Sequence, residues 1–320
     1  MSNFLNIIFC NVSTRGRLKL TGEDRVRFLN GQVTNDIKIL TKGSGCYAAL
    51  TNAKGKMRSD TVILNTGDAL FLDLESLYDV HVASELEKFV IADDVIIENL
   101  TDSWCAYTAV GEKATQLLQN AGFCDTPPTK LYQISSFPTN LQLGNGFLFR
   151  SRRALSDSFD FWIEKAYSTK LVDRLLPPLE NLGGKIHDPS ILEILRVEAG
   201  IPRFGAEMDE NTLPPEGGIE AMAISYTKGC YVGQEVIARI KSVGHINRTL
   251  IRLCLPSEAK QGNPLTFNGK EVGKLGSAIT SLKFGRIGLA IVRREASSPN
   301  TILSLPQGEA KVVEDFGLKV

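Results

Sequence analysis

The sequence has no net charge and no long apolar run. Lysine and arginine together number 36, and so do aspartate and glutamate, so the formal net charge at pH 7 is zero. This balance gives no electrostatic reason to expect a nucleic-acid partner, because proteins that bind nucleic acids usually present a basic face. No stretch approaches the roughly 20 apolar residues of a membrane-spanning helix. We therefore expect neither a nucleic-acid nor a membrane partner.

Local metal-binding and nucleotide-binding motifs are also missing. The three histidines are far apart and follow no metal or catalytic-triad spacing, and no two cysteines have CxxC spacing. This excludes a zinc ribbon, or a complete iron–sulfur ligand set, built from one local motif. The chain has no P-loop, no dinucleotide glycine fingerprint and no HExxH motif. We expect no resident metal ion.

Two features favour the cytoplasm as the location of the protein. The cysteines are scattered along the chain, which suits a compartment where thiols stay reduced. The first residues lack the cationic segment of a secretory signal, and no arginine-rich presequence follows. A cytoplasmic protein is the simplest expectation.

The length and the residue pattern predict an α+β protein with several domains. The chain has 320 residues, of which 43% are hydrophobic and 22% charged, as in ordinary globular proteins. Strand and helix patterns alternate over 1–103 and 104–187, which predicts two α+β lobes. A helix and a loop over 188–247 are expected to complete the core. Short strands over 248–320 predict a small β-barrel.

Individual helices and turns can also be predicted. Apolar residues at helical spacing predict a helix over 80–89, with Val82, Leu86 and Phe89 on its buried face. A second helix is expected over 169–176, ending before two prolines. Three hairpin turns are expected, at Asn52–Gly55, Asn145-Gly146 and Asn268-Gly269.

The most informative segment is Lys-Gly-Cys-Tyr-Val-Gly-Gln-Glu, residues 228–235. Its thiol, Cys230, lies between two glycines, which let a ligand or a partner approach the main chain closely. The cation of Lys228 favours the thiolate, the nucleophilic form of cysteine. A buried cysteine in a tight turn is the other interpretation. The chemistry of these residues does not choose between the two.

A second candidate residue, Glu198, ends a predicted helix. Asp188 and Pro189 are typical of a helix start, and Gly200 is typical of a helix end. A carboxylate in the last turn faces the negative end of the helix dipole, which is unfavourable. An arginine partner at Arg196 or Arg203 could compensate, and a ligand could as well. On the residues alone, a surface acid paired with arginine is the simpler interpretation.

Several segments together resemble one protein family. Lys-Gly-Cys-Tyr-x-Gly-Gln-Glu is the signature of the YgfZ-type folate-binding proteins, relatives of the glycine-cleavage T-protein, an aminomethyltransferase. Residues 196–202 resemble the family's Glu-Ala-Gly segment, and residues 20–25 and 28–36 resemble its N-terminal segment. The resemblance runs from about Arg15 to Arg248.

The resemblance implies a fold, a ligand and a role. It implies three lobes arranged around a central opening that holds tetrahydrofolate. It also implies that the protein supports the assembly or repair of iron–sulfur clusters, with assembly or carrier proteins and client enzymes as partners. Whether the chain itself catalyses a reaction is left open.

The resemblance also implies roles for single residues. Cys230 would be the reactive or cluster-facing thiol, and Lys228 would tune it. Glu198 would recognise the pterin, because a carboxylate can accept two parallel N–H bonds from its amino-amide edge. The remaining residues expected at the folate site are Arg196, Tyr231, Gln234, Glu235 and Arg239. The last two are also spaced i,i+4, which predicts a surface ion pair on a helix.

Three cations gather at the Asn52–Gly55 turn, at Lys54, Lys56 and Arg58. A solvated turn is the simpler interpretation. The more specific hypothesis is a binding site for the anionic glutamate tail of a folate. True aminomethyltransferases carry two aspartates just after this turn, whereas this chain has only Asp60. Some relatives have tryptophans flanking the folate site, whereas this chain has Arg15 and Leu192 at those positions.

These departures leave two alternatives beside the leading interpretation. One is a folate-dependent aminomethyl or one-carbon transferase, with Asp60 as the acid. The other is an adaptor without enzymatic activity, which docks a cluster-carrier protein through the Cys230 loop and binds no folate.

Overall fold

The computed structural model describes residues 6–314 of the chain. The chain divides into two compact units that interleave in sequence. Unit 1 contains Met1–Asn30, Asp36–Tyr47 and Thr61–Ile191, and unit 2 contains Gly31–Asn35, Ala48–Asp60 and Leu192–Val320. The four domain ranges expected from the sequence stay a prediction.

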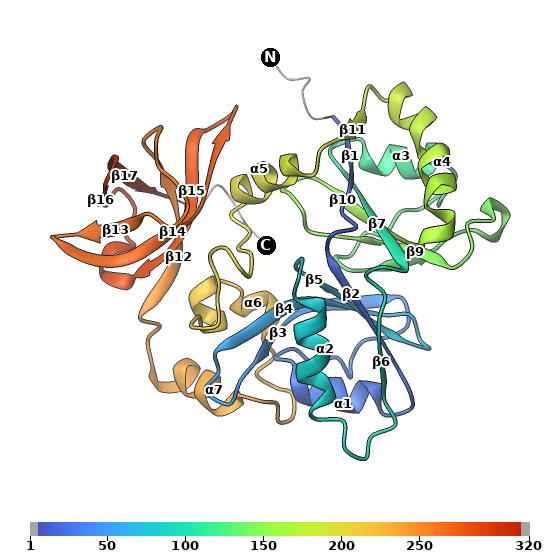
Figure 1. Cartoon of the computed structure of the whole chain (residues 1–320), viewed down its shortest axis with the longest axis horizontal. Helices are drawn as coiled ribbons and strands as arrows, with labels where there is room; N and C mark the ends of the chain where they lie inside the picture. Colours follow the sequence, from blue (N-terminus) through green and yellow to red (C-terminus); the bar gives the residue numbers. More distant parts are fainter. Residues whose placement is uncertain (1–5, 315–320) are drawn as a thin grey trace. The chain divides into compact units, whose positions relative to one another are not determined.

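Unit 1 contains a six-stranded sheet with the order β11-β1-β7-β10-β9-β8. Only the β1–β11 pair is parallel. Helices α3 and α4 lie against this sheet (Figure 1), and they share an aromatic-rich core with it. The strands are β1 (Ile8–Asn11), β7 (Trp104–Val110), β8 (Ile134–Ser136), β9 (Gly146–Arg150), β10 (Ser158–Glu164) and β11 (Lys185–His187). The helices are α3 (Ala114–Asn120), η1 (Thr139–Leu141), η2 (Lys165–Tyr167) and α4 (Ser168–Asn181).

Helix α4 extends beyond its predicted end, through Pro177 and Pro178. The buried residues Leu171, Leu175 and Leu179 recur every four positions, so they form one continuous apolar stripe. Proline removes backbone hydrogen bonds inside a helix. Here the burial of Leu179, in the turn after the prolines, outweighs that local preference.

A second, five-stranded sheet has the order β3-β4-β5-β2-β6. Helix α2 packs against β2 and β6 (Figure 1). It buries Val82 and Leu86 as predicted, but Phe89 follows the end of the helix and is 47% exposed. The strands are β2 (Gly16–Thr21), β3 (Ser44–Thr51), β4 (Met57–Asn65), β5 (Leu70–Leu74) and β6 (Ile96–Asn99). The helices are α1 (Arg25–Gln32) and α2 (Asp79–Glu87).

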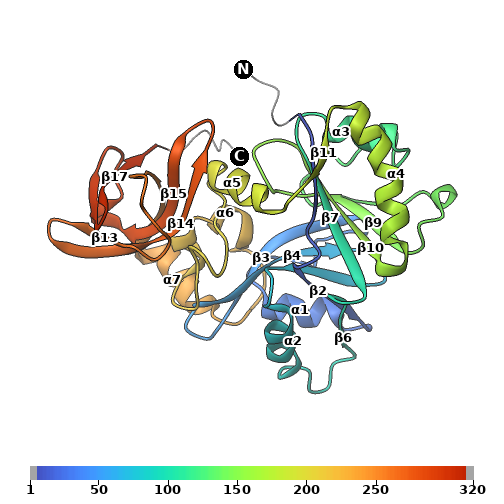
Figure 2. The same ribbon diagram turned by 45° about the horizontal axis from the view of Figure 1, so that its top comes forward.

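The C-terminal part of unit 2 is a closed six-stranded barrel with the order β12-β15-β14-β13-β16-β17. Its strands, orange to red in Figures 1 and 2, enclose an aliphatic core. Together with the mixed sheets and helices, this barrel confirms the predicted α+β class. The elements are β12 (Arg248–Cys254), β13 (Pro264–Phe267), β14 (Lys270–Ser281), β15 (Gly285–Arg293), η4 (Arg294–Ala296), β16 (Ile302–Leu305) and β17 (Gly308–Val313).

Two of the three predicted hairpin turns form. Asn52–Gly55 joins β3 to β4, and Asn268-Gly269 joins β13 to β14 with a positive φ at both residues. The turn predicted at Asn145-Gly146 is wrong, because a longer loop joins β8 to β9. Gly146 serves packing instead, since a Cβ there would lie 2.4 Å from a ring carbon of Phe137.

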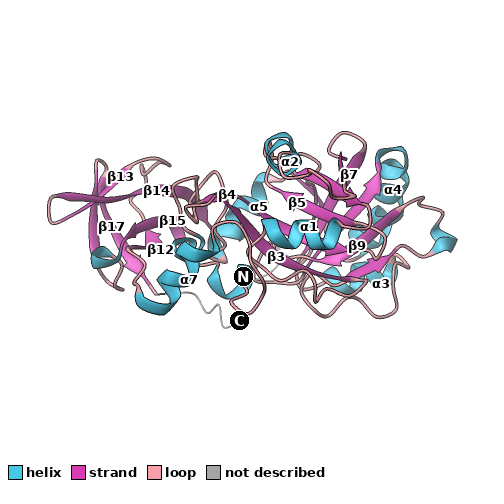
Figure 3. Ribbon diagram, turned by 90° about the horizontal axis from the view of Figure 1, so that it is seen from below, coloured by secondary structure: helices cyan, strands magenta, loops and turns pink. Residues whose placement is uncertain are grey.

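The remaining helices of unit 2 lead to the barrel, and α7 runs directly before β12 (Figure 3). They are α5 (Ser190–Glu198), η3 (Pro214–Gly217), α6 (Glu220–Ala223) and α7 (Gln234–Val243). Helix α5 begins just inside unit 1 and continues into unit 2. Within residues 6–314, no helix has both the length and the apolar character needed to span a membrane.

Candidate functional site

Residues 228–233 of the signature segment lie in the loop between α6 and α7, where the thiol faces solvent, and its last two residues begin α7. Cys230 is exposed, so the interpretation as a buried cysteine in a tight turn is wrong. The residues on either side of the thiol hold the loop. Lys228 is 8% exposed and donates hydrogen bonds to Val33 O and Asn35 O, each at 2.7 Å. The Val232 carbonyl accepts a bond from the Thr51 hydroxyl at 2.5 Å.

Of the two glycines around Cys230, Gly229 and Gly233, only Gly233 occupies a position where a side chain would clash. Gly233 has φ 85°, and a Cβ there would lie 2.4 Å from the carbonyl oxygen of Asn52. A side chain at this position would therefore push the loop off the β3–β4 turn. Gly229, in contrast, has open space around its Cβ position.

The β3–β4 turn lies directly under this loop. Gly55 has φ 69°, and a Cβ there would lie 3.2 Å from Val236 Cβ in α7. Of the three cations at the turn, Lys56 donates to Asn211 O, and Arg58 lies 3.5 Å from Glu210. Lys54 is exposed. The turn thus brings positive charge to the base of the loop, and its role as a landing site for a folate tail stays a prediction.

The ammonium of Lys228 also lies 5.1 Å from the ring centroid of Tyr231. Burial raises the pKa of Tyr231 to about 12, so this phenol stays protonated. Both residues anchor the loop from inside, on the side away from solvent. The predicted tuning of Cys230 by Lys228 and the predicted folate contact of Tyr231 are not tested by this geometry.

Gln234, Glu235 and Arg239 lie on α7, immediately after the loop. Glu235 is in the first helical turn, where a carboxylate interacts favourably with the helix dipole. Glu235 and Arg239 are both exposed. Their predicted ion pair is not found among the residues described, where the salt bridge from α7 joins Lys241 to Glu220. Their predicted folate contacts, and that of Gln234, stay predictions.

Glu198 is the last residue of α5, and the barrel holds it. Ser281, at the end of β14, donates a hydrogen bond from its hydroxyl to Glu198 Oε1 at 2.5 Å. The buried Arg252 of β12 donates to Val197 O at 3.2 Å and also to the carbonyl of Glu198. A cation thus meets the negative end of α5, which offsets the unfavourable placement of the Glu198 carboxylate.

Arg196, on the same helix, uses all its donors inside the protein. A guanidinium has five N–H groups. Those of Arg196 reach Glu193 twice, Ile201 O, Glu207 and the hydroxyl of Ser277. No donor is left for a ligand in this arrangement, which favours a structural role over the predicted folate contact. Burial opposes the charge of Glu193, but the Arg196 hydrogen bonds hold its pKa below the usual range.

Arg15, which the resemblance predicts at a tryptophan position of some relatives, lies in unit 1. Its guanidinium forms two parallel bonds with Asp73, at 2.9 and 3.0 Å, and a third bond with Glu75 at 2.5 Å. Arg153 lies 2.9 Å from the same Asp73 and also pairs with Asp160. The sequence gives no local signal for this buried charge network, because Arg15, Asp73 and Arg153 come from three distant parts of the chain.

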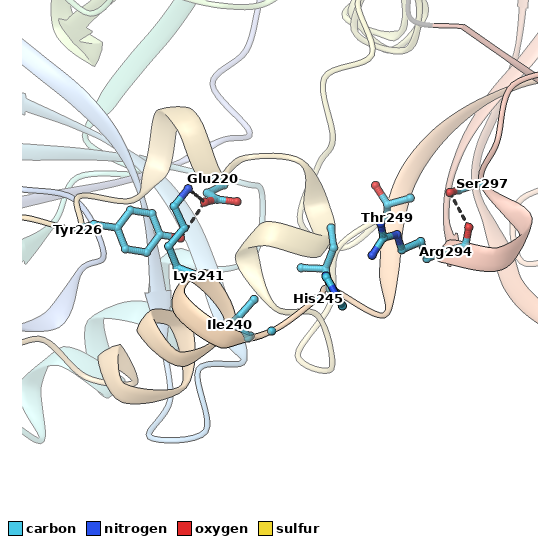
Figure 4. Close-up of a pocket in the computed structure, with 10 residues that line it drawn as sticks. Glu220, Tyr226, Ile240, Lys241, His245, Thr249, Arg294 and Ser297 are labelled. Atoms are coloured by element: carbon cyan, nitrogen blue, oxygen red, sulfur yellow. Dashed lines mark hydrogen bonds and ion pairs between the residues drawn. The ribbon is translucent and has the colours of Figure 1, made fainter.

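A hollow of about 490 Å³ opens beside α7 (Figure 4). On one side, Glu220 accepts bonds from Lys241 at 2.9 Å and from the hydroxyl of Tyr226 at 3.0 Å. A second hollow of about 680 Å³ shares His245, Ile246 and Arg294 with it. Apart from Lys56, neither hollow is lined by a residue that was expected to contact a folate. The second one contains Lys56 of the basic turn and so lies near the Cys230 loop.

Comparisons with known proteins connect this geometry with a family. Residues 6–228 match the model of the GCVT N-terminal domain. The chain is 33% identical over 235 residues to the tRNA-modifying protein YgfZ of Yersinia pseudotuberculosis serotype IB, covering 72% of the chain and 66% of that relative. The match thus spans slightly less than two thirds of the relative's own length.

Two further comparisons extend over almost the whole chain. A putative chloroplastic transferase of Arabidopsis thaliana is 26% identical over 315 residues, covering 97% of this chain and 70% of the relative. The crystal structure of the glycine cleavage system aminomethyltransferase T from Bartonella henselae superposes with a TM-score of 0.84 at 18% identity. It covers 97% of this chain and 86% of that structure, and it shows a shared fold.

Proposed function

This chain belongs to the GCVT N-terminal domain family and is related to the YgfZ proteins, and from this premise we propose that it binds tetrahydrofolate and supports the assembly or repair of iron–sulfur clusters in client enzymes. The observation that carries the proposal is the exposed thiol of Cys230 on a loop held by its neighbours. A thiol that bonds to iron or to a partner must be accessible as the thiolate.

The tethered loop suits a role in transfer to a partner. The hydrogen bonds of Lys228 and Thr51 restrain the backbone on either side of Cys230. They do not involve the sulfur, which stays exposed. A restrained loop loses little conformational entropy when it docks. The cluster is cargo in this proposal, and the cluster-carrier protein docks over the loop in the cytoplasm. Because the YgfZ relatives are named tRNA-modifying proteins, we propose that the clients include enzymes that modify tRNA.

The folate part of the proposal rests on Glu198. Its carboxylate accepts one bond from Ser281 at Oε1 and keeps further acceptor positions on both oxygens. Two acceptors side by side fit the amino-amide edge of a pterin. When bound, tetrahydrofolate would supply a one-carbon carrier, and the protein would contribute its binding and orientation.

A complementation experiment with a binding arm tests the proposal. In a strain deleted for its own copy of this protein, the wild-type chain should restore iron–sulfur enzyme activity, and Cys230→Ala should not. Calorimetry should show tetrahydrofolate binding that Glu198→Gln weakens at least tenfold, as expected for loss of a charge-assisted hydrogen-bonded pair. Full rescue by Cys230→Ala would defeat the cluster role.

Two alternatives give different results in the same experiments. Formation of methylene-tetrahydrofolate from an aminomethyl donor would favour the one-carbon transferase, for which Asp60, 8% exposed on β4, is the available acid. Rescue by the wild-type chain without any tetrahydrofolate binding would favour the adaptor.

A further inference from the structure

Among the residues described, the side chain of Ser281 in the barrel holds the carboxylate of Glu198. Ser281 is 3% exposed and ends β14 where the chain turns toward β15. Its backbone pairs with Gly285 across the turn. The serine therefore belongs to a regular β-hairpin and has a fixed place, unlike a side chain on an open loop.

The hydrogen bonds of Ser281 fix the direction of its proton. The oxygen accepts the backbone N–H groups of Lys283 and Phe284, each at 3.0 Å. A hydroxyl has two acceptor positions and one proton to donate. With both acceptor positions filled, the proton points to Glu198 Oε1 at 2.5 Å. Ser281 is therefore the donor in this pair, and Glu198 is the acceptor.

The barrel also fixes the backbone under Glu198. Arg252 donates to the last two carbonyls of α5, and Val197 packs in an apolar cluster with Ile287 and Leu289 of β15. The main chain and the carboxylate of Glu198 are thus held by the same domain. The remaining freedom of the carboxylate is rotation about its own side chain, which the Ser281 bond restricts.

We propose that Ser281 is a positioning residue that aims the Glu198 carboxylate at a ligand edge carrying two N–H donors, and that the barrel thereby sets the selectivity for a 2-amino-4-oxo pterin. This inference rests on the proposed folate binding. A carboxylate held in this direction binds a ligand with two matching N–H donors more tightly than a ligand that leaves one acceptor without a partner. Without Ser281 the carboxylate must be ordered by the ligand, and affinity falls.

A double-mutant cycle tests the proposal with the full chain. The affinity for tetrahydrofolate is measured by calorimetry for wild type, Ser281→Ala, Glu198→Gln and the double variant. We expect Ser281→Ala to weaken binding about tenfold, which corresponds to about 1.4 kcal/mol. In the Glu198→Gln background, Ser281→Ala should change the affinity less than twofold, because the carboxylate that Ser281 positions is absent. Ser281→Thr keeps the hydroxyl and should restore binding.

A ligand series gives a readout that a merely structural role would not produce. A tetrahydrofolate analogue with methyl in place of the 2-amino group lacks one donor, so Ser281→Ala should not change its affinity. The control is Ser297→Ala, which removes another serine hydroxyl of unit 2, one that donates to Arg294 O. This variant should bind both ligands like wild type. Thermal unfolding checks the fold of each variant, and Ser281→Cys replaces Ser281→Ala if the latter does not fold.

The outcomes separate this inference from the function on which it rests. Wild-type binding that Glu198→Gln weakens and Ser281→Ala does not would overturn the positioning role and leave folate binding intact. The positioning role would also be overturned if Ser281→Ala lowered the affinity equally in the wild-type and Glu198→Gln backgrounds. An equal loss of affinity for tetrahydrofolate and for its 2-methyl analogue would overturn it as well. Absence of binding by the wild-type chain would overturn the proposed function and the inference with it.

Discussion

The ammonium of Lys228 lies between the carbonyl oxygens of Val33 and Asn35, 2.7 Å from each. Both acceptors lie in the short segment Gly31–Asn35, which belongs to unit 2 although it precedes most of unit 1 in sequence. The sequence suggested a chemical role for this lysine, as a neighbour that favours the Cys230 thiolate. The structure adds a mechanical role, because the same ammonium holds the loop that carries the thiol.

Replacing Lys228 with methionine separates these two roles. The variant is expected to lose about 2 kcal/mol of unfolding free energy in urea, because two carbonyls lose a charged donor. If anchoring dominates, Cys230 should react faster with iodoacetamide, since the loop becomes mobile. If thiolate tuning dominates, it should react more slowly. We expect faster reaction, measured by mass spectrometry with the exposed Cys254 as internal control.

Alanine at Gly233 should destabilise the protein, whereas alanine at Gly229 should not. At Gly233 the φ of 85° and a Cβ placed 2.4 Å from Asn52 O both oppose a side chain. The expected cost is about 2 kcal/mol or more. Gly229 has no atom within 4 Å of its Cβ position, so its change should stay within about 0.5 kcal/mol. Equal urea midpoints for the two variants would contradict this account.

Replacing Arg196 with methionine should destabilise unit 2 strongly. The side chain of Glu207 is fully buried, and its carboxylate lies 3.0 Å from Arg196 Nη1. Removing one partner of a buried pair leaves an uncompensated charge, which costs about 3–5 kcal/mol. Arg239→Met, at an exposed position of α7, is the matched control, with an expected change within about 0.5 kcal/mol. Urea unfolding measures both, and a loss at Arg196 no larger than the control would remove its structural role.

Acid should destabilise unit 1 through Asp73. Burial opposes the charge of this carboxyl, but Arg15 and Arg153 hold its pKa below the usual value. A folded-state pKa below the unfolded value of about 3.9 stabilises the fold above that pH. This contribution is lost as pH falls from about 4 through the folded pKa. Asp73→Asn should be less stable at pH 7 and should lack this acid-dependent loss. Parallel curves of urea midpoint against pH for the two proteins would contradict the prediction.

Turns and regular elements could be predicted where one local requirement decides the structure. Asn268-Gly269 needs a positive φ at both residues, and the hairpin forms there. The same dipeptide at Asn145-Gly146 misled the prediction, because that glycine is required by the ring of Phe137. Both a close approach to an aromatic ring and a tight turn require glycine, so the sequence alone does not distinguish them.

Roles that depend on distant partners could not be predicted. The donors of Arg196 are satisfied by Glu207 and by Ser277, and Ser277 is 81 positions away. Glu193 and Ile201, which are near in sequence, accept its other three bonds, but they do not indicate the distant contact with Ser277 that leaves no donor for a ligand. The Ser281–Glu198 pair, 83 positions apart, was missed for the same reason. The exposure of Cys230 likewise follows from where its neighbours are tethered.

The interleaving of the two units has a consequence for how the thiol loop is made. Lys228 and the carbonyl of Val33 are separated by 195 positions, so the loop cannot close during synthesis until most of the chain has left the ribosome. A recombinant fragment that starts at Leu192 would contain Cys230 and the whole barrel, yet would lack the acceptors for Lys228 and the Thr51 tether. Such a truncated product would carry the signature motif without the hydrogen bonds that restrain it. In the full chain, formation of this long-range contact would limit how quickly newly made protein acquires its native loop.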